Sequence, residues 1–201
     1  MIYLTEFFSA FLTAVMMENL LFTRAIDIPN LYKKRSFQQT LIVGALLTGI
    51  VTVSSIPAYF LNGLFKSHAA FVPYMTLSFL LLNGAVFLGF YFGIRRFLPK
   101  LFSLMEKFLP FYGVNCVTLG TLLIAARLSS GTKFLSFFGY CFGSGVGFTI
   151  ALLIMWSIRQ KMSLSHTPKT FRGLPITLIY LGIVSLAPVS YTHLTLPTIL
   201  R

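Results

Sequence analysis

Acidic residues are nearly absent from this sequence of 201 residues. Asp and Glu together number 4, whereas Lys and Arg number 16, and charged residues make up only 10% of the chain. The surface of a soluble globular domain needs far more charge, because such domains are about a quarter charged overall. Cysteines number 2 and aromatic residues make up 16%. These values exclude a disulfide-stapled secreted fold and a disordered chain.

Apolar residues, in contrast, make up 56% of the chain and include 22 Phe. They gather in long runs, each interrupted by few charges or none. A helix of about 20 apolar residues crosses the hydrocarbon core of a bilayer, and backbone groups in lipid must bond within such a helix. The sequence therefore predicts an all-α integral membrane protein with six transmembrane helices. We expect these helices at residues 1–23, 36–65, 67–94, 108–126, 134–158 and 173–187.

The basic residues are distributed unevenly between the connections of these helices. The first, third and fifth connections hold twelve Lys and Arg residues, and the second and fourth hold three. The positive-inside rule then places the odd connections in the cytoplasm and both termini outside. The net charge of +12 is thus explained by topology and by attraction to anionic lipid, although a docking surface for an acidic soluble partner stays open. We expect no nucleic-acid partner.

A short motif recurs half a chain apart. The first span ends in MENLL at residues 17–21, and the fourth contains GVNCV at residues 113–117. Superposing Asn19 on Asn115 overlays the second span on the fifth and the third on the sixth. Two halves of three spans each, at about 1–98 and 99–187, would be inverted relative to each other, and such repeats place sites at the midplane on broken helices. We expect helices one and four to be broken there, although the pairing of two Asn residues by chance is an open alternative.

Few residues in the predicted spans suit chemistry. Glu18 is an acid within an apolar run, where such groups usually have a partner or face a water-filled cavity; it would be merely solvated if it reached the far interface. Asn19 and Asn115 are the other candidate polar residues of the midplane. Glycines at every fourth position, namely Gly139, Gly143 and Gly147, indicate close helix packing.

Cys116 lies in the fourth span, where a lone Cys is more often a packing residue than a ligand. The sequence holds no catalytic triad, no paired carboxylates and no nucleotide-binding glycine loop. We therefore expect no catalysis by this chain alone.

Several strings resemble the Rnf/Nqr family of membrane subunits. They are FLPFYGVNCVTLG at 108–120, FGSGVGF at 142–148, SIRQK at 157–161, TFRG at 170–173 and MENLL at 17–21. Together they cover roughly residues 5–187. Within this family the chain is most similar to the A-type subunit of Rnf, the counterpart of the E-type subunit of Nqr, as a divergent member.

The resemblance implies a multi-pass subunit of an electron-transport complex in the bacterial cytoplasmic membrane. Such complexes pass electrons across the bilayer and couple this transfer to movement of Na⁺ or H⁺. The implied partners are other Rnf/Nqr-type subunits, above all a homologue of opposite topology, and the lipid bilayer. The family's paired subunits share a [2Fe–2S] cluster, held by thiolates from the broken helices of each.

Residue by residue, the resemblance assigns one cluster ligand to this chain. Cys116 corresponds to the ligand of the second half. The family has a Cys immediately before a Pro in the first half, and here Ile28 precedes Pro29. One thiolate of the expected pair is therefore absent. A small membrane transporter component that uses Glu18, and a structural paralogue without a cofactor, are the two alternatives.

The end of the sequence departs from the family. Pro188 and Pro197 fall where the family's last span continues, and Pro breaks the hydrogen bonds of a helix. We therefore expect the single membrane domain to cover residues 1–187 and the sixth helix to end there. Residues 188–201 would then form an atypical tail that is an artefact of the sequence.

Overall fold

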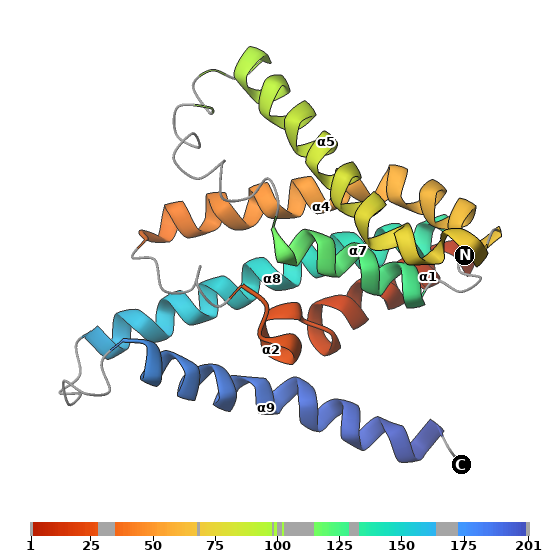
Figure 1. Cartoon of the computed structure of the whole chain (residues 1–201). Helices are drawn as coiled ribbons and strands as arrows, with labels where there is room; N and C mark the ends of the chain where they lie inside the picture. Colours follow the sequence, from red (N-terminus) through yellow and green to blue (C-terminus); the bar gives the residue numbers. More distant parts are fainter. Residues whose placement is uncertain are drawn as a thin grey trace.

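Helices form every regular element in the part of the chain that the computed structural model describes, which comprises residues 2–27, 35–67, 69–97, 99, 102, 115–128, 133–163 and 173–199. In chain order they are α1 (Ile2–Leu12), the π-helix η1 (Thr13–Met17), α2 (Leu20–Arg24), α4 (Phe37–Ser67), the 3-10 helix η2 (Ala69–Tyr74), α5 (Met75–Phe97), α7 (Cys116–Leu128), α8 (Phe134–Ser163) and α9 (Leu174–Ile199). Figure 1 shows their arrangement. The predicted all-α class is confirmed for these residues. The expected start of the fourth helix, at 108–114, lies outside them.

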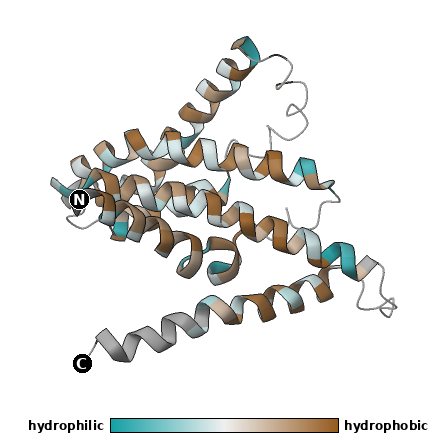
Figure 2. Cartoon of the chain, turned by 180° about the vertical axis from the view of Figure 1, so that it is seen from behind, coloured by the Kyte–Doolittle hydropathy of each residue, from teal (hydrophilic) through white to brown (hydrophobic). Residues whose placement is uncertain are grey.

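Three helical segments have the length and composition to cross a membrane, namely Phe37–Ser67, Val72–Phe97 and Phe134–Met162. Shorter apolar helices cover Leu4–Met17, Cys116–Leu128 and Leu174–Pro188. Figure 2 shows hydrophobic residues along the length of these helices. Large apolar side chains such as Leu81 and Phe92 on α5 are more than half exposed, which suits a helix that faces lipid. The protein is therefore built as an integral membrane protein.

The centre of the bundle is the antiparallel contact between α4 and α8. A Cβ added at Gly145 would lie only 2.8 Å from the Cα of Thr48. A Cβ added at Gly44 would likewise collide with the side chain of Thr149. The hydroxyls of Thr48 and Thr149 lie 3.2 Å apart, within hydrogen-bond distance. Small residues allow the two backbones to approach, and this contact explains why both helices are half buried.

The glycines at every fourth position lie along the contact between α8 and α1. A Cβ added at Gly139, Gly143 or Gly147 would meet the backbone of α1 and η1 at 2.8, 2.6 and 3.0 Å, at Phe7, Phe11 and Val15 respectively. The residue numbers of the contacting positions increase together along the two helices, so the helices run parallel. The rings of Phe11 and Phe142 stack beside this contact, with centroids 5.7 Å apart. Glycine is needed here because any side chain would displace the α1 backbone.

The helix α9 runs through the position where we expected the last span to end. It continues from Leu174 to Ile199 and includes both Pro188 and Pro197. The expected helix end near residue 187 is therefore wrong. Proline is tolerated within membrane helices because neighbouring groups and local adjustment satisfy the freed carbonyls.

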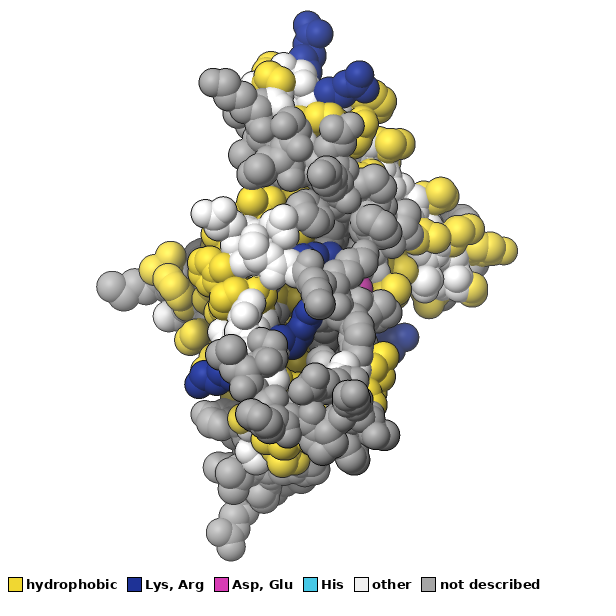
Figure 3. All heavy atoms as spheres, turned by 90° about the vertical axis from the view of Figure 1, so that its left-hand side faces the viewer, with side chains coloured by type: hydrophobic (Ala, Val, Ile, Leu, Met, Phe, Trp, Pro, Cys, Tyr) yellow, Lys and Arg dark blue, Asp and Glu magenta, His cyan; other side chains and the backbone are white. Residues whose placement is uncertain are grey.

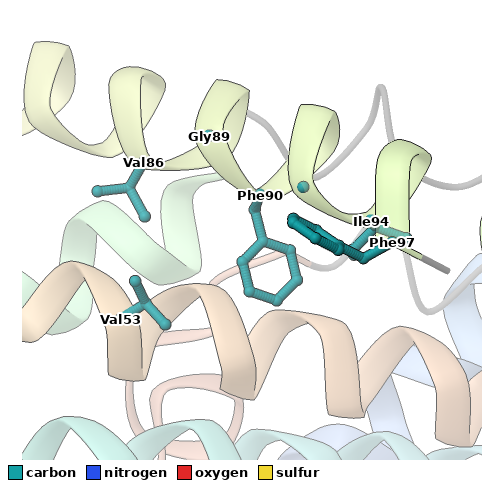
Figure 4. A pocket seen from close by; sticks show the side chains of 7 residues that line it. Val53, Val86, Gly89, Phe90, Ile94 and Phe97 are labelled. Carbon is teal, nitrogen blue, oxygen red and sulfur yellow. The ribbon is translucent and has the colours of Figure 1, made fainter.

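A groove of about 450 Å³ separates α4 from the second half of α5 (Figure 4). It is lined by Val53, Val86, Gly89, Phe90, Gly93, Ile94 and Phe97. This lining is apolar throughout. The groove therefore offers no polar group for chemistry, and we place the candidate site elsewhere.

Candidate functional site

The first helix is interrupted where the sequence motif ends. The π-helix η1 closes with the N–H of Glu18 bonded to the carbonyl of Thr13 at 3.0 Å. Asn19 then begins the next helix, because its side-chain Oδ1 accepts a hydrogen bond from the N–H of Leu21 at 3.1 Å. Asn is among the best residues for such an N-cap. The chain therefore leaves helical geometry at Glu18 and resumes it at Leu20.

The cap at Asn19 also ties this break to α8. The Nδ2 of Asn19 donates to the carbonyl of Gly147 at 2.7 Å, and this hydrogen bond is buried. The side chain of Asn19 is 4% exposed, so an unbonded amide there would be costly. The close packing of α1 on the glycines of α8 brings this carbonyl within reach.

Asn115 performs the same function at the start of α7. Its Oδ1 accepts from the N–H of Val117, again at 3.1 Å, and its side chain is 5% exposed. Its Nδ2 lies 3.5 Å from Oδ2 of Asp27, at the limit of a hydrogen bond. Asp27 adopts a left-handed backbone conformation with φ of 70°. The structure therefore brings the segment after α2 to the start of α7.

The two cysteines differ in environment. Cys116 is the first residue of α7 and its side chain is exposed, whereas Cys141 is fully buried in α8. Within the described ranges, no three His, Cys, Asp or Glu residues come together in a way that could hold a metal ion. Ile28, where the resemblance would require a second thiolate, lies outside those ranges.

Glu18 has a protein partner in the membrane segment. Its Oε2 accepts a hydrogen bond from the hydroxyl of Tyr140 at 2.6 Å. The side chain of Tyr140 is buried and that of Glu18 is partly buried. Glu18 is therefore hydrogen-bonded within the protein. Tyr140 was not among the residues predicted for the site.

Polar contacts between helices lie at the two ends of the bundle. At one end Lys133 and Glu6 form a salt bridge of 2.9 Å. At the other end the indole N–H of Trp156 donates to the carbonyl of Arg35 at 3.0 Å. Because α4 is antiparallel to α8, Arg35 before α4 and Lys161 in the last turn of α8 share this second end. Figure 3 shows Lys and Arg side chains at several points of one face.

The interrupted first helix, the Asn caps of α2 and α7 and the exposed apolar side chains define a helical membrane protein. The chain belongs to the family described as Rnf-Nqr subunit, membrane protein, whose match spans residues 7–196. It is 29% identical over 192 residues to the A-type subunit of the ion-translocating oxidoreductase complex of Serratia proteamaculans, a match covering 95% of this chain and 98% of the relative. Subunits of the same name from Pectobacterium carotovorum and Yersinia enterocolitica are 28% and 26% identical with the same coverage.

Proposed function

We propose that this chain is a membrane subunit of an Rnf/Nqr-type complex, which passes electrons across the membrane and couples them to Na⁺ or H⁺ transport. The observation that carries this proposal is the family match over residues 7–196. The relatives that are similar over 98% of their length are named as the A-type subunit of an ion-translocating oxidoreductase complex. We expect the chain to act as a component of such a complex and to show no catalysis alone.

We propose six membrane-spanning segments arranged as two inverted halves. The matching caps at Asn19 and Asn115, each with a 3.1 Å bond to the N–H two residues on, support this repeat. The antiparallel contact of α4 with α8 joins the second span of each half. Both termini then face the outer side of the bacterial cytoplasmic membrane, because the twelve basic residues of the odd connections face the cytoplasm.

The cap at Asn19 lies near the middle of the membrane in this arrangement. Asn19 bonds to Gly147, which is about 21 Å along α8 from Lys133 and about 14 Å from Trp156, at the helical rise. These two residues mark the opposite ends of the bundle, and their separation matches the hydrocarbon core of about 30 Å. The break therefore puts polar groups where repeat-built membrane proteins place their sites.

Cys116 is the residue of this chain that suits a shared [2Fe–2S] cluster. Its thiol is exposed at the start of α7, so a second subunit can reach it, whereas the buried thiol of Cys141 is out of reach. A bound cluster would supply one-electron transfer. With Ile28 in place of a thiolate, this chain would supply one ligand, Cys116, and the remaining ligands would have to come from the partner, a homologue of opposite topology.

The other residues of the site hold Cys116 in place. Asn115 fixes the first turn of α7 through its cap, and its amide reaches towards Asp27 on the other half of the chain. The hydroxyl of Thr121 pairs with that of Ser144 at 3.1 Å, which fixes α7 against α8. These contacts orient the thiol towards the surface of the subunit rather than into its core.

The experiment that tests this function is complementation in the source bacterium. A strain lacking this chain is given back the wild-type gene or the Cys116→Ser variant, and electron transfer with its coupled ion movement is measured in membrane vesicles. We expect the wild type to restore both and Cys116→Ser to restore neither. Restored activity with Cys116→Ser would instead favour a structural paralogue without a cofactor, which the missing first-half thiolate also suggests.

Ion or solute movement without any electron donor would contradict the redox function. It would favour the small transporter, in which Glu18 is the transport residue. A Glu18→Gln variant that abolishes this donor-independent flux would assign the function to the transporter alternative.

A further inference from the structure

Glu18 and Tyr140 form a hydrogen-bonded acid pair between the first helix and α8. The donor–acceptor distance of 2.6 Å falls in the range of charge-assisted O–H···O⁻ hydrogen bonds, which are about 2.5–2.7 Å long. Tyr140 is 6% exposed. The pair joins residues 122 positions apart in the sequence, so only the folded bundle creates it.

The pair lies within the membrane-spanning part of the bundle. Tyr140 is about 10 Å along α8 from Lys133, at the helical rise, and Glu18 directly precedes the cap that bonds to Gly147. Burying an unpaired carboxylate within the membrane costs free energy, so an acidic residue at such a place is a candidate for a functional site. Glu18 also ends a π-helical segment, and π-helical interruptions are frequent at functional sites.

In the described part of the chain, the carboxylate of Glu18 accepts its hydrogen bond from the hydroxyl of Tyr140. The salt bridge found there joins Lys133 to Glu6. The elements packed against η1 are α1, α8 and α9, and beyond Glu6 the titratable side chains described on their apolar stretches are Tyr140, Cys141 and Tyr180. Arg24, in the last turn of α2, is the basic residue on the helix that follows Glu18. The hydroxyl of Tyr140 therefore stabilises the carboxylate of Glu18.

A hydroxyl partner suits reversible protonation. Tyr donates to the carboxylate when Glu18 is ionised, and it can accept from the carboxylic acid when Glu18 is protonated. Binding a proton adds one H⁺ to the carboxylate and changes no other bond.

We propose that Glu18 and Tyr140 form a proton-binding site of this subunit, at which Glu18 takes up and releases a proton inside the membrane. The inference rests on the proposed function, because an ion-translocating complex gives such a site its role. The ion that binds at Glu18 is then the proton.

Infrared spectroscopy of the purified intact complex tests this site. The complex is titrated with acid while at rest, without electron donor, and the carbonyl stretch of a protonated carboxylic acid is followed. We expect Glu18→Gln to lose this band, since it removes the acid but keeps its shape. Tyr140→Phe should shift the band, because the hydrogen bond to the acid is lost. The matched control Glu6→Gln, at the exposed salt bridge, should leave it unchanged.

An unchanged band in Glu18→Gln, or a band displaced by Na⁺ at constant pH, would overturn the proposal. If Glu18→Gln does not assemble, the Tyr140→Phe spectrum decides, and an unshifted band there overturns it equally. Because the titration needs no electron transfer, its failure is distinct from a failure of complementation. A complex that complements but lacks the band retains its redox function without this proton site.

Discussion

Asn19 and Asn115 make the same hydrogen bond, with Oδ1 of each 3.1 Å from the backbone N–H two residues further along the chain. Each side chain is at most 5% exposed, so each cap is part of the interior. They differ in their second contact, which goes to the carbonyl of Gly147 for Asn19 and to Asp27 for Asn115. Asn19 thus fixes the start of α2 to α8, whereas Asn115 connects the start of α7 to the segment that follows α2.

Replacing Asn19 tests whether the cap holds the first break. Asn19→Ala removes the cap and the bond to Gly147, and each loss destabilises by about 1 kcal/mol. We expect a lower thermal midpoint of the purified protein in detergent. Asn19→Ser keeps a capping oxygen but cannot reach Gly147 in the same way, so its midpoint should lie between those of Asn19→Ala and the wild type. Equal midpoints for all three would show that the cap is not a stabilising element.

Replacing a glycine of α8 tests the contact with α1. A Cβ at Gly143 would lie 2.6 Å from the carbonyl oxygen and 2.9 Å from the Cα of Phe11. Backbone atoms cannot rotate away, so Gly143→Ala should destabilise by about 1–3 kcal/mol, as overpacking does. The measurement is the thermal midpoint in detergent.

Gly63→Ala is the matched control, because nothing lies within 4 Å of a Cβ at Gly63 in α4. Alanine is favoured over glycine in helices by about 0.5–1 kcal/mol, so this variant should be neutral or slightly stabilising. Similar destabilisation by both variants would contradict the close contact between α1 and α8.

The salt bridge between Glu6 and Lys133 should contribute little to stability. Their side chains are 34% and 49% exposed, and exposed ion pairs contribute about 0–1 kcal/mol. Glu6→Gln should therefore shift the thermal midpoint only slightly, and added salt should reduce the shift further. A loss as large as that of Gly143→Ala would mean that this contact, rather than the glycine packing, fixes α1.

Reporter fusions test the inverted arrangement of the two halves. We expect reporters fused beside Lys33 and Lys161 to report the cytoplasm, because those connections carry the positive charge. Reporters beside Lys66 and Lys133 should report the outside. A result that puts Lys33 and Lys161 on different sides of the membrane would exclude two inverted three-helix halves.

The sequence predicted the helices better than their ends and partners. Long charge-free runs located α4, α5 and α8 to within a few residues, except for the start of α5, because hydrophobic length determines a membrane span. The prediction that α9 ends before Pro188 was wrong, because the packed environment overrides the tendency of proline to break a helix. The Asn motif located the first break, and the break is visible at Glu18. The partner of Glu18 could not be predicted, because Tyr140 reaches it only through the packing of α8 against the first helix.

We propose that this chain helps to hold an electron-carrying cluster at Cys116. The most direct measurement is the iron content and visible spectrum of the complex, purified after co-expression with the partner of opposite topology. We predict that both signals disappear in Cys116→Ser and persist in Cys141→Ser, whose buried thiol is a packing residue. Iron and spectrum that are unchanged in Cys116→Ser, or absent from the wild-type complex, would contradict the claim.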